Sequence, residues 1–245
     1  MKTVGLIGCG AIGTVLAEAI ERGLVVCDEL FVFDVDKARA EQLKKAVNFE
    51  VNIVPSFEDL LKSKPSVIVE AASQQAAKEY VPRIVKTKAE LIVMSTGALL
   101  DLPVDLRRVH VPSGAIGGLD ALASAALAGI KEVTLTSRKN PNALGKSNTK
   151  EEILYEGTAE EAAHKFPREM NVAATLALTV KPAKVKVQVI SDPAVKRNTH
   201  EIQVKWQFGD MFLRFSNEPH PENPHTSALA AWSAIRLLQT LLEKT

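Results

Sequence analysis

Cysteine is scarce in this chain, because Cys9 and Cys27 are the only two among its 245 residues. Two thiols at this spacing make neither a disulfide framework nor a metal-ligand or redox motif. We therefore expect both thiols to be reduced, in a protein of the cytoplasm that binds no metal. A small side chain at position 9 also suits the glycines that flank it.

Long apolar runs are missing as well. The first one, Val4 to Ile7, is only a few residues long and is followed by glycines, so it does not have the form of a secretory signal. Elsewhere no run approaches the roughly 18 residues that a membrane-spanning helix needs. The sequence therefore predicts no association with a membrane.

The chain also lacks an excess of charge of either sign. Lys and Arg number 30 against 29 Asp and Glu, which gives a net charge of +1. That balance offers no field to attract nucleic acid or an anionic membrane. Hydrophobic residues make up 46% and charged residues 24%, as in ordinary globular proteins. The length suits one large or two modest domains.

Glycine, in contrast, is placed in a pattern near the N-terminus. Gly8, Gly10 and Gly13 follow the apolar run and precede a predicted helix over residues 11–22. In a dinucleotide-binding loop, the first glycine allows the turn, the second leaves room for the pyrophosphate, and the third lets the helix sit close to the strand. The first N–H groups of the helix, at Ala11 and Ile12, then face the phosphates.

An acidic residue follows at the expected distance. Asp34 ends a second apolar run about 20 residues beyond the last glycine, where a carboxylate binds the ribose hydroxyls of NAD and repels the phosphate of NADP. Lys37 and Arg39 are close enough in sequence to soften that repulsion, so NAD is favoured and NADP stays open. The alternative is a βαβ unit in which the glycines serve only packing.

Strands and helices alternate as far as residue 112, which predicts an α/β fold with a Rossmann-type doubly wound parallel sheet. Val67 to Val69 and Leu91 to Met94 have the apolar character of strands buried on both faces. The carboxyl ends of parallel strands line the ligand crevice. We therefore assign to cofactor binding the small residues that follow these two strands: Ala71, Ala72, Ser73 and Thr96.

Residues 113–225 have a different pattern and predict a second, α+β domain for substrate binding and dimerisation. Its strands alternate apolar and polar residues, which is typical of a mixed or antiparallel amphipathic sheet with helices on one face. Residues 208–211 resemble a hairpin turn, residues 140–149 a mobile loop, and residues 226–245 a helix that packs back onto the first domain. The polar face of the sheet is either solvated or stacked on a second copy in a homodimer; it comprises Thr134, Thr136, Lys186 and Gln188.

A dehydrogenase needs a group that handles protons, and histidine suits that role. Of the five histidines, His164 is expected on a surface helix, and His220 and His225 in a proline-rich segment. His110 lies near the crossing between the domains. His200 begins an amphipathic strand and is the best candidate for a catalytic base, although a strand-end histidine bonded to backbone would look the same.

Several motifs together resemble the archaeal and bacterial L-aspartate dehydrogenase family over nearly the whole chain. They are GCGAIG at 8–13, VEAAS at 69–73, STGAL at 95–99, SGAIGG at 113–118, FPREMNVAATLAL at 166–178, RNTHEI at 197–202 and NPHTS at 223–227. The family pattern usually carries Asn where this chain has Glu169. The resemblance implies NAD(P)-dependent, reversible oxidation of L-aspartate through iminoaspartate to oxaloacetate and ammonia, and is compatible with a place in pyridine nucleotide biosynthesis.

The resemblance also implies roles for particular residues. It assigns catalysis to His200, a substrate contact to Asn171 and a cofactor contact to Asn223. The two substrate carboxylates need donors, and we expect these from Asn171 and from the N–H groups of Ser113, Gly114 and Ala115 at a helix start. Arg168 could add a guanidinium, although a surface ion pair is an equally good interpretation.

Two other functions stay open at this point. One is a related two-domain dehydrogenase, such as a homoserine dehydrogenase; the motif of the dihydrodipicolinate reductases is not found here. The other is an NAD-binding redox sensor without catalysis, which would bind cofactor but turn over no amino or oxo acid.

Overall fold

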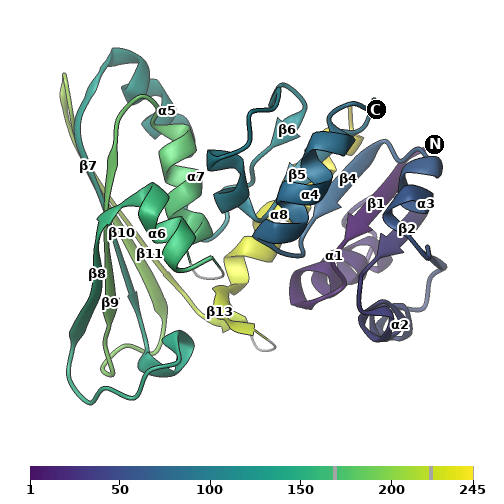
Figure 1. The fold of residues 1–245 in the computed structure, drawn as a ribbon, viewed down its shortest axis with the longest axis horizontal. Helices are drawn as coiled ribbons and strands as arrows, with labels where there is room; N and C mark the ends of the chain where they lie inside the picture. The colour runs from purple at the N-terminus through teal and green to yellow at the C-terminus, as the bar shows by residue number, and fades with distance from the viewer. Residues whose placement is uncertain (168–169, 221–222, 245) are drawn as a thin grey trace. The chain divides into compact units, whose positions relative to one another are not determined.

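The structure is a computed structural model, and it describes residues 1–167, 170–220 and 223–244. The chain divides into two compact units, one formed by Met1–Pro112 with Ala231–Thr245 and the other by Ser113–Ala230. Figure 1 shows the elements of both units along the chain. Within the described residues, no helix combines the length and the apolar character needed to cross a membrane.

The first unit is built on a six-stranded sheet in the order β3-β2-β1-β4-β5-β6, with every pair parallel. This is the strand order of a Rossmann fold, and the predicted fold class is confirmed. Its strands are β1 (Thr3–Ile7), β2 (Glu29–Phe33), β3 (Val51–Ile53), β4 (Val67–Glu70), β5 (Glu90–Val93) and β6 (Val109–His110).

Helices connect these strands and begin where the sequence provides caps. Asp36 accepts a hydrogen bond from the N–H of Ala38, and Ser73 accepts one from the N–H of Ala76, each at the start of a helix. The helices are α1 (Ala11–Glu21), α2 (Lys37–Ala46), α3 (Phe57–Lys62) and α4 (Gln74–Ile84), with a 3₁₀ turn η1 (Thr96–Leu100). The C-terminal part of α8 (Ala228–Leu242) belongs to this unit, where Gln239 Nε2 donates to the carbonyl of Leu24.

The second unit contains a five-stranded sheet in the order β11-β10-β7-β9-β8. The β7–β9 pair is parallel and the other pairs are antiparallel, so the sheet is mixed, as predicted. The strands are β7 (Ile130–Lys139), β8 (Glu152–Thr158), β9 (Val185–Ser191), β10 (Asn198–Trp206) and β11 (Gly209–Asn217); a small hairpin adds β12 (Pro219–His220) and β13 (Asn223–Ser227).

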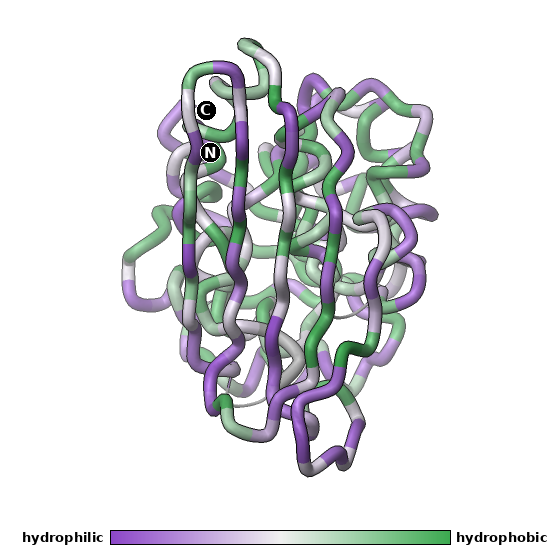
Figure 2. The backbone as a smooth tube through the Cα atoms, turned by 90° about the vertical axis from the view of Figure 1, so that its left-hand side faces the viewer, coloured by the Kyte–Doolittle hydropathy of each residue, from purple (hydrophilic) through white to green (hydrophobic). Residues whose placement is uncertain are grey.

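The two faces of this sheet differ in composition. The helices α5 (Leu119–Ala128), α6 (Ala159–Lys165) and α7 (Asn171–Thr179) lie on one face (Figure 1). Figure 2 looks onto the opposite face, over which none of the described helices runs. The face under the helices, called the inner face below, buries one residue in two: Val133 and Leu135 on β7, Val185, Val187 and Val189 on β9, and Ile202 and Val204 on β10.

Three local features differ from what the sequence led us to expect. The hairpin turn lies at residues 207–208, because β11 already begins at Gly209, which pairs with Trp206. The segment expected to be a mobile loop contains a 3₁₀ turn, η2 (Pro141–Leu144), in which Pro141 and Ala143 are buried. Ser113, Gly114 and Ala115 do not lie at a helix start, because α5 begins four residues further on, after Gly118 in a left-handed conformation.

Candidate active site

The glycine-rich loop has the geometry that a dinucleotide requires. A Cβ atom at Gly13 would lie 2.3 Å from the carbonyl oxygen of Gly8, so only glycine lets α1 approach β1 this closely. Gly8 has a φ of +96°, and a Cβ there would meet the backbone of Ala71 at 2.7 Å. A Cβ at Gly10 would meet nothing within 4 Å, which leaves open space in front of the helix N-terminus.

The N-terminus of α1 is suited to phosphate. Gly10 is its N-cap residue and offers no side chain to the helix end. Since the first N–H groups of an α-helix have no acceptor within the helix, those of Ala11, Ile12 and Gly13 can bind an anion. Geometry and chemistry therefore fit the pyrophosphate of a dinucleotide.

Asp34 is held against this loop. Its Oδ2 accepts a hydrogen bond of 2.8 Å from the N–H of Cys9, and its Oδ1 accepts one of 2.9 Å from the N–H of Asp36. The carboxylate is thus fixed next to the phosphate-binding turn, as a contact to a ribose requires. Burial, and secondarily the charge of Asp34, raise the pKa of the Cys9 thiol to about 12, so this thiol stays protonated.

A buried carboxylate connects the ends of β4 and β5. Glu70 is fully covered and accepts hydrogen bonds from the N–H groups of Ala72 and Ser73 and from both the N–H and the hydroxyl of Ser95. Burial raises its pKa, against the effect of these four donors. Sequence reasoning treated Glu70 only as the end of a strand, although a carboxylate in an otherwise apolar strand was the available signal.

The residues predicted to contact the cofactor at these strand ends have different exposures. Ala71 is half-buried, and Ala72 and Ser73 are exposed, so all three are available at the edge of the sheet. Thr96 is only 2% exposed, which leaves little of its side chain for a ligand.

His200 lies on the inner face of the second sheet. The residue is 2% exposed, and Nδ1 is 2.9 Å from the hydroxyl of Ser137, the residue directly opposite on β7. Burial, followed by the charge of Lys139, lowers the pKa of His200 to about 3. The imidazole is therefore neutral at physiological pH and able to accept a proton.

Two neighbouring rows of residues cross the sheet at this end. The first, here called the histidine row, contains Val189, Ser137, His200 and Phe215. The second, here called the polar row, contains Ser191, Lys139, Asn198 and Asn217. Arg138 on β7 is paired with Thr199 on β10. Because the strands are antiparallel, the next residue on β7, Lys139, is opposite the preceding residue on β10, Asn198.

The glycine-rich loop at 113–118 lies against the same two rows. The carbonyl of Ala115 accepts a hydrogen bond of 2.8 Å from Asn217 Nδ2 in the polar row. A Cβ at Gly117 would come within 3.3 Å of the Phe215 ring in the histidine row. The structure thus brings Ser113, Gly114 and Ala115 to the end of the sheet that carries His200.

Sequence reasoning missed three residues of this cluster: Ser137, Lys139 and Asn198. All three are buried, with exposed fractions of 0%, 2% and 1%. The alternation that placed Val133 and Leu135 on the inner face also places Ser137 and Lys139 there. Likewise, the parity of Ile202 and Val204 extends to His200 and Asn198. The alternation was visible in the sequence, but the prediction did not extend it to the ends of β7 and β10.

The remaining predicted site residues are placed less fully. Asn171 is the first residue of α7 and is half-buried. Arg168 lies outside the described residues, as does the side chain of Asn223, whose backbone begins β13. Among the other histidines, His164 is exposed, and His110 pairs with Glu90.

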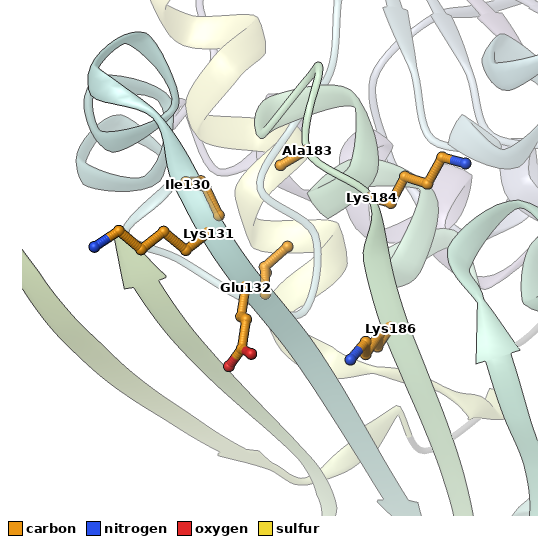
Figure 3. A pocket seen from close by; sticks show the side chains of 7 residues that line it. Ile130, Lys131, Glu132, Ala183, Lys184 and Lys186 are labelled. Atoms are coloured by element: carbon orange, nitrogen blue, oxygen red, sulfur yellow. The ribbon is translucent and has the colours of Figure 1, made fainter. Parts of the chain in front are cut away.

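A separate hollow of about 310 Å³ lies at the opposite end of β7 and β9. Figure 3 shows Lys131 and Lys184 at its rim, with their amines pointing away from each other. Glu132, which also lines it, is 3.0 Å from Lys205 Nζ. Because these two amines do not point to a common place, they cannot bind one anion together, and we assign no chemistry to this hollow.

Taken together, the first unit is a Rossmann-type nucleotide-binding domain, and the second carries a buried, neutral imidazole in a polar cluster. This combination defines the class as nicotinamide-nucleotide-dependent oxidoreductases of two-domain build.

Comparison with known proteins identifies the family. The family model described as "Aspartate dehydrogenase, C-terminal" matches residues 120–241, and "Homoserine dehydrogenase, NAD binding domain" matches residues 8–111. L-aspartate dehydrogenase from Archaeoglobus fulgidus is 43% identical over 98% of this chain and 98% of its own. The protein of the same name from Methanothermobacter thermautotrophicus is 41% identical over 99% and 97%. The chain belongs to the aspartate dehydrogenase family, which confirms the resemblance seen in the sequence motifs.

Solved structures agree with this result. Aspartate dehydrogenase from Thermotoga maritima superposes with a TM-score of 0.76 at 31% identity, covering 98% of this chain and 97% of that one. A myo-inositol dehydrogenase from Lactobacillus casei reaches 0.57 at 13% identity, over 86% and 73% of the two chains, and shows the fold alone.

Proposed function

We propose that the chain oxidises L-aspartate with a nicotinamide cofactor to iminoaspartate, which water converts to oxaloacetate and ammonia, and that it also catalyses the reverse reductive amination. The observation that carries this proposal is the neutral, buried His200, oriented by Ser137, in the unit that matches the aspartate dehydrogenase model. The bound cofactor supplies the acceptor for the hydride that leaves Cα.

The chain's own residues supply the proton chemistry. Hydride leaves Cα only when the amine is neutral, so a base must take a proton from the ammonium group of aspartate. His200 can do this through Nε2, because Nδ1 is next to the Ser137 hydroxyl. Once that proton has passed to solvent, the same nitrogen can remove a proton from the water that attacks the imine carbon and deliver it to the amine, which then leaves as ammonia.

The N–H groups of Ser113, Gly114 and Ala115 and the amide of Asn171 are proposed donors to the substrate, with Arg168 as a further donor. The loop at 113–118 is supported by its contacts with the polar and histidine rows. A substrate carboxylate close to His200 would favour its protonated form, opposite to the effect of Lys139, and so raise the pKa of the ring toward the working pH.

In the first unit, the proposed cofactor contacts are Gly8, Gly10, Ala11, Ile12 and Gly13 at the phosphates, Asp34 at the ribose, and Ala71, Ala72, Ser73 and Thr96 at the nicotinamide half. Asn223, which belongs to the second unit, is a further proposed contact. Asp34 favours NAD over NADP. Replacing Asp34 by Ser should raise the ratio of kcat/KM for NADPH to that for NADH by at least tenfold, which corresponds to about 1.4 kcal/mol.

We also propose a homodimer in which two copies of the open sheet face stack. Phe212 and Ile153 support this, because they are 58% and 54% exposed on strands that form the sheet. Arg214 pairs with Glu201 and Lys205 pairs with Glu132 on this sheet, so these charges offset one another where a second copy would stack. Sedimentation as a monomer at micromolar concentration would end this proposal.

We propose a cytoplasmic location because Cys9 and Cys27 are both free thiols.

Oxidation assays test the function. Purified protein with NAD should oxidise L-aspartate, while L-homoserine and L-alanine should give less than about a hundredth of its kcat/KM. Preferential oxidation of L-homoserine would favour the related dehydrogenase instead. Tight NAD binding without turnover of any of these would favour a redox sensor.

A further inference from the structure

The polar row is an unusual feature of the inner face. Apart from Ser137 and His200, the buried residues of that face on β7, β9 and β10 are apolar, from Val133 and Val185 at one end to Val189 in the histidine row. Beyond the histidine row, however, Ser191, Lys139 and Asn198 are all at most 2% exposed. Polar groups are removed from water in this way when they have bonding partners. The Ser191 hydroxyl has such a partner, because it donates a hydrogen bond of 2.7 Å to Asn148 Oδ1.

Asn198 shows which partner is expected. Among the described residues, its Nδ2 atom is buried and has no hydrogen-bond acceptor. Buried amide groups nearly always have an acceptor, so a donor that lacks one indicates a place for a ligand oxygen. The donor lies in the strand that carries His200, two residues before it.

Lys139 indicates that the ligand carries a negative charge. It lies across the sheet from Asn198 and next to Ser191, with only 2% of its surface exposed. An ammonium group and an amide N–H together form a donor set for a carboxylate. Lys139 follows Ser137 by two residues on β7, and Ser137 contacts His200, so Lys139 and His200 lie on the same face of the sheet in neighbouring rows. The charge of Lys139 contributes to lowering the pKa of His200.

We propose that Lys139 and Asn198 bind the side-chain carboxylate of the substrate, an inference that rests on the function proposed above. Residues two apart on a strand are about 7 Å apart, so the polar row and the histidine row are separated by a distance that a short dicarboxylate can span. The reacting Cα then lies at His200 and the distal carboxylate at the polar row. This arrangement explains how the site distinguishes a dicarboxylic amino acid from alanine.

Lys139→Met is the direct test, because methionine keeps most of the length of the side chain and removes the charge. With the NADH-bound enzyme, succinate binding by calorimetry should weaken roughly 10- to 100-fold, and the KM for oxaloacetate should rise by a similar factor. The kcat should change less than the KM. Lys184→Met, at an exposed position directly before β9, is the matched control and should leave both values unchanged.

Asn198→Leu provides a second test, since leucine has a similar shape and no donor. Succinate affinity should fall by about tenfold while thermal stability is unchanged or increased, because a buried donor without an acceptor is removed. Unchanged succinate affinity in both variants, no succinate binding by the wild type, or a fall in kcat with constant KM would overturn the inference. A wild type that binds succinate but does not aminate oxaloacetate would instead contradict the proposed function.

Discussion

Ser137 and His200 are directly opposite each other on neighbouring strands, and the serine hydroxyl is 2.9 Å from Nδ1 of the imidazole. Both side chains are almost completely buried. This contact fixes the orientation of the ring and leaves Nε2 as the nitrogen for proton transfer.

Ser137→Ala should therefore lower kcat about 10- to 100-fold, because the ring loses the partner that orients it. The affinity for NADH, which is bound by the first unit, should not change by more than about twofold. Steady-state rates and fluorescence titration with NADH measure the two quantities. Ser216→Ala, at an exposed position on β11, is the control. A kcat equal to that of the wild type would show that this hydrogen bond has no role in catalysis.

The lowered pKa of His200 predicts how stability depends on pH. Between the ordinary value of 6.5 and the folded value of about 3, the unfolded state binds a proton at this residue and the folded state does not. Stability is therefore lost as the pH falls through this window, by up to about 1.4 kcal/mol per pH unit. Replacing His200 by Gln removes this contribution. Urea unfolding between pH 6.5 and 4.5 should show a flatter dependence for the variant, and equal slopes would contradict the assignment.

The glycine loop offers a matched pair of substitutions. Gly10→Ala should leave the free energy of unfolding within about 1 kcal/mol of the wild type, since its Cβ meets nothing within 4 Å. It should nevertheless weaken NADH binding, because the methyl group occupies the space of the pyrophosphate. Gly13→Ala should destabilise the fold by several kcal/mol, because its Cβ would lie 2.3 Å from a carbonyl oxygen. If Gly10→Ala weakened NADH binding only in proportion to its loss of stability, as Gly13→Ala would, the result would argue against a phosphate site at Gly10.

Glu70 should act through the two loops that it connects. In Glu70→Gln, an NH₂ group faces at least one backbone N–H in place of a carboxylate oxygen, which costs about 1–3 kcal/mol. The free energy of unfolding should fall by that amount, and the Kd for NADH should rise because the ends of β4 and β5 lose their alignment. Glu58→Gln, which removes a surface ion pair with Arg83, is the control and should have little effect on either. Unchanged NADH affinity would limit the role of Glu70 to stability.

The nucleotide-binding half was largely predictable from the sequence, because its signals are local. The spacing of Gly8, Gly10 and Gly13 specifies a turn and a close approach, and continuous β-branched strands are typical of a parallel sheet. The cluster around His200 was not, since it depends on which strands become neighbours. Ser137 and His200 are 63 residues apart in sequence, and nothing local indicates that they meet. Alternation alone places Lys139 on the inner face, but only the register places it opposite Asn198.

The role of His200 is tested most directly by reductive amination with the His200→Ala variant, using oxaloacetate, ammonium and NADH. Turnover should fall by at least three orders of magnitude while the Kd for NADH stays within about threefold of the wild type. If the variant turned over oxaloacetate at the wild-type rate, His200 would not be the group that moves the proton, and the proposed mechanism would be wrong.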